Sequence, residues 1–381
     1  MVLGTRALEK MAMSRVPFGG VFAGRRVFVT GHTGFKGSWL CLWLHELGAR
    51  VVGYALAPDT KPSLFQAMGV DRLVESHLGD VRDFDRLSGL MRRAKPEVVF
   101  HLAAQPIVRL SYRQPVETFA VNLQGTVHLL EAVRRTPSVR ACLVVTTDKC
   151  YENRAGRLLT ETDRLGGHDP YSASKACAEL AVSSYRDSFF PPAQFGRHKL
   201  SLSSARAGNV IGGGDWAGDR LLPDCMRAWA RGAAALVRNP DSVRPWQHAL
   251  DPIAGYLHLA RRQLRRPKAH AEAWNFGPAS APNVTAAEIV RAAASAWGGG
   301  KWRTPRRGGV RLREAPALRL DSGKARRRLG WHPIFGTARA VAETVRWYRG
   351  FYRERGFDAL AFSRSQIQDF LAAGRARPWL W

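Results

Sequence analysis

One segment constrains the fold of this 381-residue chain more than any other: TGHTGFKG, at residues 30–37. It follows a β-branched run, RRVFVTG (25–31), and precedes SWLCLWLHELG (38–48), whose apolar residues recur at helical spacing before a glycine stop. A glycine-rich turn between a strand and a helix is typical of nucleotide-binding α/β domains. A turn with a purely structural role is the alternative interpretation.

The alternation of strands and helices continues along the first half. Further strands are expected at 49–56, 77–81, 96–104, 140–148 and 199–210, with helices at 83–94 and 121–135. This pattern predicts an α/β fold, a Rossmann doubly wound parallel sheet with helices on both faces. From about residue 212 the sequence becomes Gly- and Asp-rich and then mostly helix and loop. It predicts a smaller C-terminal substrate-binding domain.

The expected domain boundaries follow from this change of pattern. Residues 1–20 are expected to form a flexible N-terminal extension, and 21–211 a dinucleotide-binding Rossmann domain. Residues 212–381 are expected to form mainly the substrate-binding domain, with some segments returning to the Rossmann domain.

A requirement of the backbone explains why each of these three positions in the loop is glycine. Gly31 allows the sharp turn, Gly34 lets the backbone approach a pyrophosphate, and Gly37 lets the helix pack close to the sheet. The helix N-terminus then presents free N–H groups and its positive dipole end to the phosphates.

The choice between the two common dinucleotides is left open at this end of the chain. The second strand ends in GYALAP, which has no acidic residue for a ribose diol, and Lys36 and Arg50 keep a 2′-phosphate possible. Asp80 and Val81, after the third strand, are expected at the edge of an adenine ring.

The segment YSASK places Tyr171 and Lys175 four residues apart, on one face of a helix. A nearby ammonium and a nicotinamide cation would lower the pKa of the phenol from about 10 towards neutrality, which makes a base for alcohol oxidation. A surface Tyr–Lys pair is the alternative for so common a pattern.

A second group of polar residues, TTDKCYEN (146–153), follows the fifth strand at its carboxyl end, where open α/β sheets bind ligands. Thr147 can hydrogen-bond a sugar hydroxyl beside Tyr171. Simple oxidation needs no carboxylic acid, so Asp148 suggests loss of water, in which one group removes a proton and another protonates a departing hydroxyl. The alternative is that Asp148 caps a turn and Lys149 is solvated.

The charge of the chain is its least ordinary compositional feature. Lys and Arg number 58 against 31 Asp and Glu, a formal net charge of +27, with 33 basic against 13 acidic residues in positions 191–381. Such a balance raises a nucleic acid or an anionic membrane surface as a partner. Only ten of the 58 are Lys, however, which favours compositional drift plus a small anionic ligand.

Other motifs are excluded more simply. The five cysteines include no C-x-x-C pair, so neither a disulfide framework nor a zinc site is indicated, and no metal is expected. No stretch reaches the roughly 20 apolar residues of a membrane span. We therefore expect a cytoplasmic protein with no membrane and no nucleic-acid partner.

Several motifs together carry a closer resemblance. From about Phe18 to the LGWHP segment near Gly330, the chain resembles the CDP-glucose 4,6-dehydratases, a branch of the extended short-chain dehydrogenase/reductases. The loop and YSASK are common to that superfamily, whereas the other motifs are more specific to the branch. The segments that carry the resemblance are TGHTGFKG, HLAAQPIVRLSY, TTDKCYEN, PYSASK, RAGNVIGGGDWAGDR and RPWQHALD.

The resemblance implies a role for each catalytic residue. Tyr171, assisted by Thr147, would deprotonate the sugar C4 hydroxyl as hydride passes to NAD, and Lys175 would bind the nicotinamide ribose. Asp148 would protonate the C6 hydroxyl as water leaves, before the hydride returns to C6. Lys149 stands where related dTDP-glucose enzymes carry the glutamate base for C5, and a lysine can act so only as the neutral amine or indirectly.

The resemblance also implies the binding residues and partners. The redox-neutral cycle favours NAD over NADP, CDP-D-glucose would be the substrate, and a homodimer is the family expectation. Trp216 and Trp246 would either stack on the base or pack in the core. The substrate residues would be Asn209, Arg220, Arg244 and Asn275. The cofactor residues would be Gly31, His32, Gly34, Phe35, Lys36, Gly37, Asp80, Val81, Leu102, Ala103, Gln105, Thr146, Tyr171 and Lys175.

The sequence therefore predicts a nucleotide-sugar 4,6-dehydratase that makes CDP-4-dehydro-6-deoxy-D-glucose for deoxysugar or O-antigen biosynthesis. The alternatives are a dehydratase or epimerase acting on a dTDP-, UDP- or GDP-sugar, and a non-catalytic Rossmann nucleotide-binding protein. Asp148 and Lys149 argue against an epimerase, which does not need that acid.

Overall fold

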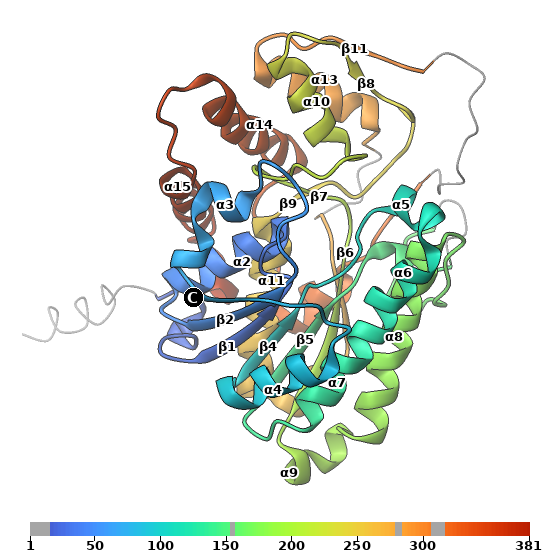
Figure 1. Cartoon of the computed structure of the whole chain (residues 1–381), viewed down its shortest axis with the longest axis vertical. Helices are drawn as coiled ribbons and strands as arrows, with labels where there is room; N and C mark the ends of the chain where they lie inside the picture. The colour runs from blue at the N-terminus through green and yellow to red at the C-terminus, as the bar shows by residue number, and fades with distance from the viewer. Residues whose placement is uncertain (1–15, 153–156, 279–283, 306–316) are drawn as a thin grey trace, which may run out of the picture.

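The computed structural model describes residues 16–152, 157–278, 284–305 and 317–381. Seven parallel strands form one sheet in the order β10-β6-β5-β4-β1-β2-β3 (Figure 1). The strands are β1 Arg26–Thr30, β2 Arg50–Ala55, β3 Glu75–Leu78, β4 Val98–His101, β5 Ala141–Val145, β6 Ser201–Ala207, β7 Val210–Ile211, β8 Ala235–Leu236, β9 Gln247–His248, β10 Ala273–Phe276 and β11 Trp302–Arg303.

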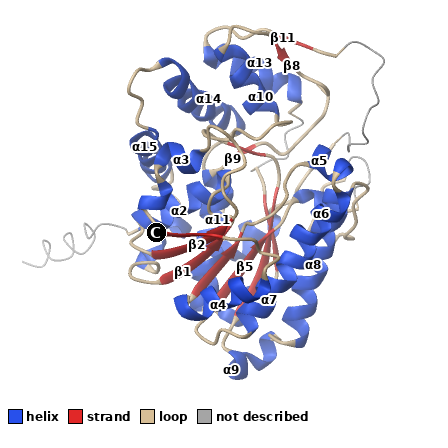
Figure 2. Cartoon of the chain, viewed as in Figure 1, coloured by secondary structure: helices blue, strands red, loops and turns tan. Residues whose placement is uncertain are grey.

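Helices cover both faces of this sheet and form most of the upper part of the molecule in Figure 2. The longer ones are α2 Phe35–Glu46, α4 Phe84–Ala94, α7 Gly125–Arg134, α8 Pro170–Ser188, α10 Leu221–Ala230, α11 Leu250–Arg265, α13 Ala286–Trp297, α14 Thr337–Arg353 and α15 Ala359–Ala373. The shorter ones are η1 Pro17–Gly20, α3 Leu64–Met68, η2 Val70–Arg72, α5 Val108–Arg113, α6 Pro115–Phe119, η3 Ala120–Gln124, η4 Asp148–Cys150, η5 Pro192–Gln194, α9 Phe195–His198, α12 Pro267–His270, η6 Ala325–Leu329 and η7 Pro378–Leu380.

Successive residues of each strand face opposite sides of the sheet, and this separates two hydrophobic cores. In β1, Val27 and Val29 are buried in the core that contains α2 and α11. Phe28, between them, is buried in the second core, with Leu87 of α4 and Leu129 of α7. The doubly wound parallel sheet predicted from the alternating sequence is confirmed.

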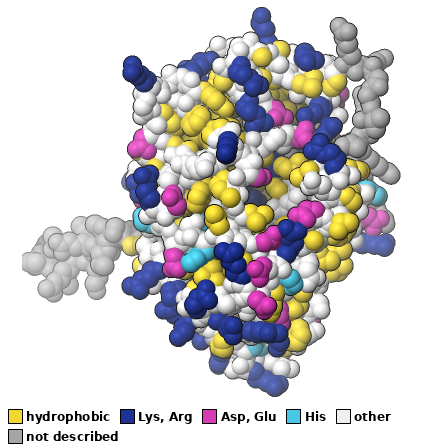
Figure 3. All heavy atoms as spheres, in the orientation of Figure 1, with side chains coloured by type: hydrophobic (Ala, Val, Ile, Leu, Met, Phe, Trp, Pro, Cys, Tyr) yellow, Lys and Arg dark blue, Asp and Glu magenta, His cyan; other side chains and the backbone are white. Residues whose placement is uncertain are grey.

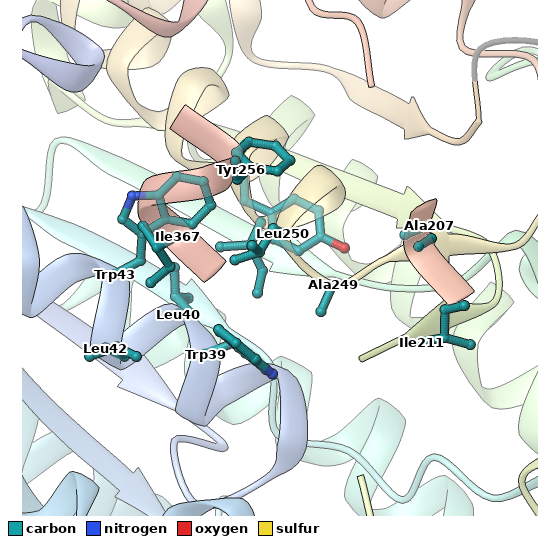
Figure 4. Packing of buried hydrophobic residues seen from close by; sticks show 14 of the residues in the cluster. Trp39, Leu40, Leu42, Trp43, Ala207, Ile211, Ala249, Leu250, Tyr256 and Ile367 are labelled. Carbon is teal, nitrogen blue, oxygen red and sulfur yellow. The ribbon is translucent and has the colours of Figure 1, made fainter. Parts of the chain in front are cut away.

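A second lobe, built from α10, α13 and α14 with the short ladders β8–β11 and β7–β9, lies above the sheet in Figure 1. The lobes share a core. Figure 4 shows Trp39 and Trp43 of α2 beside Leu250 of α11 and Ile367 of α15. The Trp39 indole N–H donates to the carbonyl of Gly213 at 3.1 Å. β10 returns to pair with β6 in the main sheet.

The structure corrects one boundary of the predicted domains. Phe18 is fully buried and packs on Phe22 and Trp43, with ring centroids 6.1 and 5.9 Å apart. The expected flexible extension over 1–20 is therefore wrong for Pro17–Gly20, because an aromatic side chain at this position reaches the core beside α2. Residues 1–15 of that prediction lie outside the described residues.

On the face shown in Figure 3, Lys and Arg side chains are scattered over the molecule, with acidic and hydrophobic side chains between them. Many form ion pairs, such as Arg82 with Glu117 at 2.7 Å. No helix among the described residues has the length and apolar character needed to cross a bilayer.

Candidate active site

A cavity of about 450 Å³ lies between the carboxyl ends of β5 and β6 and the second lobe. Its volume is in the range of small-molecule binding sites. Residues far apart in the sequence reach it because parallel strands end at the same edge of a sheet. The predicted site residues that line it are Phe35, Lys36, Thr146, Thr147, Lys149, Tyr171, Asn209, Arg220 and Arg244.

The glycine loop is shaped by close backbone contacts. Gly31 has φ of +75°, and a Cβ there would lie 2.6 Å from the backbone nitrogen of Ala103. A Cβ on Gly37 would lie 2.0 Å from the carbonyl oxygen of Gly31. Gly34 is the N-cap of α2 and offers no side chain to cap it, so the first N–H groups of the helix are left for a ligand. This loop fits the pyrophosphate of a dinucleotide cofactor.

The other predicted cofactor residues differ in what their side chains contact. His32 is buried, pairs with the Ser76 hydroxyl at 2.7 Å and points away from the cavity; burial lowers its pKa to about 4. Lys36 reaches the cavity, and burial together with Lys175 and Arg220 lowers its pKa to about 7.

The remaining predicted cofactor residues lie along the carboxyl ends of the strands. The Asp80 carboxylate is held by the Arg82 guanidinium, with Nε 3.0 Å from both oxygens, and Val81 is buried against Gly125. Gln105 donates to the Thr118 hydroxyl at 2.9 Å. Leu102 and Ala103 follow β4, where their backbone N–H groups donate to the Thr30 carbonyl and hydroxyl.

Tyr171 and Lys175 lie in the first turns of α8, which Asp169 caps by accepting from the Ser172 N–H at 2.9 Å. Both side chains are buried. Burial raises the pKa of Tyr171 to about 12, and a hydrogen bond with Thr147 opposes this shift. Burial lowers the pKa of Lys175 to about 8. The expected lowering of the Tyr171 pKa towards neutrality is thus not produced by the protein's own groups, because burial outweighs them.

Asp148 and Lys149 form an ion pair at the end of β5. Lys149 Nζ lies 3.5 Å from Asp148 Oδ1 and 3.4 Å from the Asn209 side-chain oxygen. Asp148 Oδ1 also accepts from the Thr147 hydroxyl at 3.1 Å, whereas its buried Oδ2 has no hydrogen-bond partner among the described residues. Lys149 lines the cavity, whereas Asp148 lies buried next to it and is not among the lining residues.

Two of the predicted arginines supply positive charge to the cavity wall. Arg220, at the N-cap of α10, pairs with Asp215 at 2.7 Å. Arg244 is buried and donates to the carbonyl of Val243 at 2.8 Å. Asn209 lines the same wall between them and Lys149.

The structure does not bring Asn275 to the cavity. It is fully buried in β10, where its amide N–H groups donate to the carbonyls of Leu159 and Asp321 at 3.1 Å. Its side-chain oxygen accepts from the Tyr151 hydroxyl at 2.7 Å. The amide is committed to protein partners, so the position has a structural function here.

Other cavity residues were missed from the sequence. Arg109 of α5 and Arg238, after β8, line the cavity and flank Asp219 at 3.6 and 2.6 Å. Arg109 lies within HLAAQPIVRLSY, a motif that already indicated the family, but no spacing rule singles it out. Trp246 lines the cavity, whereas Trp216 packs against Trp347 and other aromatic residues in the core.

The strand order, the glycine loop and the Tyr171–Lys175 pair define a Rossmann-type protein of the short-chain dehydrogenase/reductase class. Among the described residues there is no cluster of three or more His, Cys, Asp or Glu that could hold a metal ion.

Comparison with known proteins narrows this class. The family model described as GDP-mannose 4,6 dehydratase matches residues 28–344. The CDP-glucose 4,6-dehydratase of Salmonella typhimurium is 48% identical over 352 residues, which cover 92% of this chain and 97% of that protein. The chain therefore belongs to the nucleotide-sugar 4,6-dehydratase family that includes this CDP-glucose enzyme.

Solved structures agree with the fold. The UDP-glucose 4-epimerase of Thermus thermophilus, in complex with NAD, has a TM-score of 0.70 at 27% identity and covers 85% of this chain and 99% of its own. DesIV, a dTDP-glucose 4,6-dehydratase of Streptomyces venezuelae, has a TM-score of 0.71 over 86% of this chain and 99% of its own, at 24% identity.

Proposed function

We propose that this protein is an NAD-dependent dehydratase that converts CDP-D-glucose to CDP-4-dehydro-6-deoxy-D-glucose and water. The observation that carries the proposal is that Lys149 and Tyr171 line one cavity and that Lys149 is ion-paired with the buried Asp148. An acid and a base beside an alcohol-oxidising tyrosine suit elimination of water. The 48% identity to a CDP-glucose 4,6-dehydratase supports CDP-D-glucose as the substrate.

Tyr171 is the proposed base for the sugar C4 hydroxyl. The Thr147 hydroxyl hydrogen-bonds the phenol, and Lys175 lies one helical turn further along α8. The glycine loop and Lys175 would hold NAD, which would supply the hydride acceptor for C4 and the hydride donor for C6. Burial raises the pKa of Tyr171, so the phenol needs a nearby positive charge to ionise, which a bound nicotinamide would supply.

Asp148 and Lys149 carry out the proposed elimination. Once C4 is a ketone, the C5 proton is acidic; Lys149 takes it, and Asp148 protonates the C6 hydroxyl, which leaves as water. Lys149 Nζ and Asp148 Oδ1 lie 3.5 Å apart, so the two groups can act on neighbouring carbons of one sugar. One pair can thus supply both the base and the acid.

Arginine side chains in the cavity wall provide a binding site for the diphosphate of the nucleotide. Arg220 and Arg244 are the proposed phosphate ligands, since guanidinium groups donate to two phosphate oxygens at once. Asn209 is proposed to contact the substrate beside Lys149. The second lobe supplies both arginines, which supports a substrate-binding role for it.

A direct test is turnover of four nucleotide hexoses. Purified protein with added NAD is incubated with CDP-, dTDP-, UDP- and GDP-linked hexoses, and formation of the alkali-absorbing 4-keto product is followed. We expect product from CDP-D-glucose at a rate well above that from the other three.

The other outcomes separate the rival functions. Preferential turnover of another nucleotide hexose would assign the protein to a different branch of the family. Inversion at C4 without loss of water would identify a 4-epimerase. Binding of NAD with no turnover of any sugar would identify a non-catalytic binding protein.

Three further expectations go with this function. We propose a homodimer formed through helices of the sheet domain, supported by exposed apolar side chains on α6 and α8, where Val116 is 82% and Leu180 58% exposed. The product is proposed to feed deoxysugar or O-antigen synthesis in the cytoplasm. Light scattering of the purified protein tests the dimer.

A further inference from the structure

One face of α8 carries a third buried polar residue beyond the two that the proposed chemistry uses. Tyr171, Lys175 and Glu179 are spaced four residues apart, so their side chains lie in one row along the helix. Glu179 is only 3% exposed. A buried carboxylate is costly unless it is paired, so its partners indicate what it does.

Glu179 connects three elements of the site. One of its oxygens accepts a short hydrogen bond from the hydroxyl of Thr146, the residue that precedes Thr147 at the end of β5. The other accepts from the Ser204 hydroxyl and from Arg206 Nη2, both at 2.7 Å and both on β6. The carboxylate therefore fixes α8 against the end of β5, which carries Thr147.

Arg206 compensates the charge of Glu179 and extends the contacts beneath the cavity. Its guanidinium is buried, and Nη1 donates to the Tyr151 hydroxyl at 2.8 Å. That hydroxyl in turn donates to Asn275 at 2.7 Å. We call these four residues, Glu179, Arg206, Tyr151 and Asn275, the buried network. It accounts for the position of Asn275 outside the cavity.

The groups around Glu179 leave it ionised. Burial raises the pKa of Glu179. Arg206 and the hydrogen bonds from Thr146 and Ser204 lower this pKa by more than burial raises it, so the net shift is downward. The other titratable groups facing it are Cys150 and Tyr151 beside β5 and Arg186 further along α8.

The negative charge of Glu179 acts on the pKa of Lys175. Burial lowers the pKa of Lys175, and Glu179 is the first of the charges that raise it again, followed by Cys150. Lys36 from α2 and His101 from β4 also face Lys175, and both are repelled by its ammonium. Glu179 is thus the carboxylate that opposes burial and these neighbouring basic groups.

We propose that Glu179, with Arg206 as its counterion, is a positioning residue that keeps Lys175 an ammonium beside Tyr171 and aligns Thr147 with them. It does not touch the substrate; it acts through Lys175 and through Thr146. The inference rests on the proposed catalytic use of Tyr171 and Lys175.

The test is the pH profile of kcat for Glu179→Gln, which removes the charge but keeps the size of the side chain and one accepting oxygen. Because activity requires the Lys175 ammonium, we expect the alkaline limb to move to lower pH by about one unit, about a tenfold loss on that limb. The KM for CDP-glucose should stay within about twofold. Glu161→Gln is the matched control, since Glu161 accepts from the Asn275 N–H at the far end of the buried network.

A double variant separates positioning from folding. Glu179→Gln with Arg206→Met removes both buried charges and leaves neither unpaired, so the free energy of unfolding should recover. We expect the alkaline limb to stay displaced in the double variant. An unmoved limb in Glu179→Gln, or a limb restored in the double variant, would overturn the proposal.

A second readout keeps this inference separate from the proposed function. The pKa of Lys175, followed by NMR of ¹⁵N-lysine-labelled protein without substrate, should fall in Glu179→Gln and stay unchanged in Glu161→Gln. If the wild-type protein turned over no nucleotide sugar, the proposed function would fail while this titration still decided the effect of Glu179 on Lys175. An unchanged Lys175 titration would contradict the inference whatever the activity.

Discussion

The glycine loop and the cavity wall are built in different ways. The loop is shaped mainly by residues close in sequence, such as Gly31 and Gly37, whose backbones approach closely, and Ala103 after β4 packs against Gly31. The wall brings together Lys149, Asn209, Arg220 and Arg244, which are contributed by separate loops. One part is a local motif, and the other exists only after folding.

This difference decides which site residues can be recognised from the sequence and which need the structure. A local motif constrains backbone conformation, so its residues can be recognised by type and spacing. A wall assembled from distant loops has no spacing rule, and its arginines look like any others in a chain with 58 basic residues. Substitutions in the glycine loop and in the cavity wall should therefore affect different properties of the protein.

The largest effect is expected at Asp148, after β5, which is ion-paired with Lys149 of the cavity wall. Asp148→Asn removes the proposed acid while keeping the size of the side chain and the Thr147 contact. Because the amide cannot protonate the departing hydroxyl, we expect kcat for dehydration to fall about 10²- to 10⁴-fold. The Kd for CDP-glucose, measured by calorimetry, should change little. Wild-type turnover in Asp148→Asn would remove the assigned acid role.

A smaller effect is expected in the loop. In Gly37→Ala, the new Cβ would meet the Gly31 carbonyl at 2.0 Å, and backbone there cannot move cheaply. We expect a loss of about 1–3 kcal/mol in the free energy of unfolding, measured by urea denaturation, together with weaker NAD binding. Gly196→Ala is the control, because nothing lies within 4 Å of its added Cβ. Equal stability of the two variants would show that the loop is looser than described.

The smallest effect is expected in the cavity wall. Arg220→Met removes one phosphate ligand but leaves the acid, the base and the loop, so we expect KM for CDP-glucose to rise about tenfold with kcat within about twofold. Steady-state kinetics measures both. Arg227→Met is the matched control: it lies on the same helix and pairs with Asp224, but it does not line the cavity. A similar rise in both variants would assign the effect to α10 as a whole.

Much of the fold and part of the site could be predicted from the sequence. Six of the seven sheet strands were predicted to within a few residues, because apolar β-branched runs separated by amphipathic helices admit few other arrangements; the seventh, β10, was not predicted. Tyr171, Lys175, Asp148 and Lys149 were recognisable as residue types at set spacings, and the structure places them together.

The exceptions have physical causes. Asn275 lies in NFGP, where sequence cannot show that its amide is already used by Leu159, Asp321 and Tyr151. Glu179 was not singled out, since one acidic residue on a helix resembles any other until its partners on β5 and β6 are known. The raised pKa of Tyr171 also needed burial, which is a tertiary property.

The sequence by itself determined the doubly wound sheet, the conformation of the glycine loop and the identity of the proposed reacting groups. These depend on local periodicity, on backbone freedom at glycine and on side-chain chemistry. The tertiary structure decided which charges face the cavity, which polar groups are already satisfied and how strongly burial shifts each pKa. Those properties depend on distances between residues that are remote in the chain, and such distances exist only once the two lobes have packed.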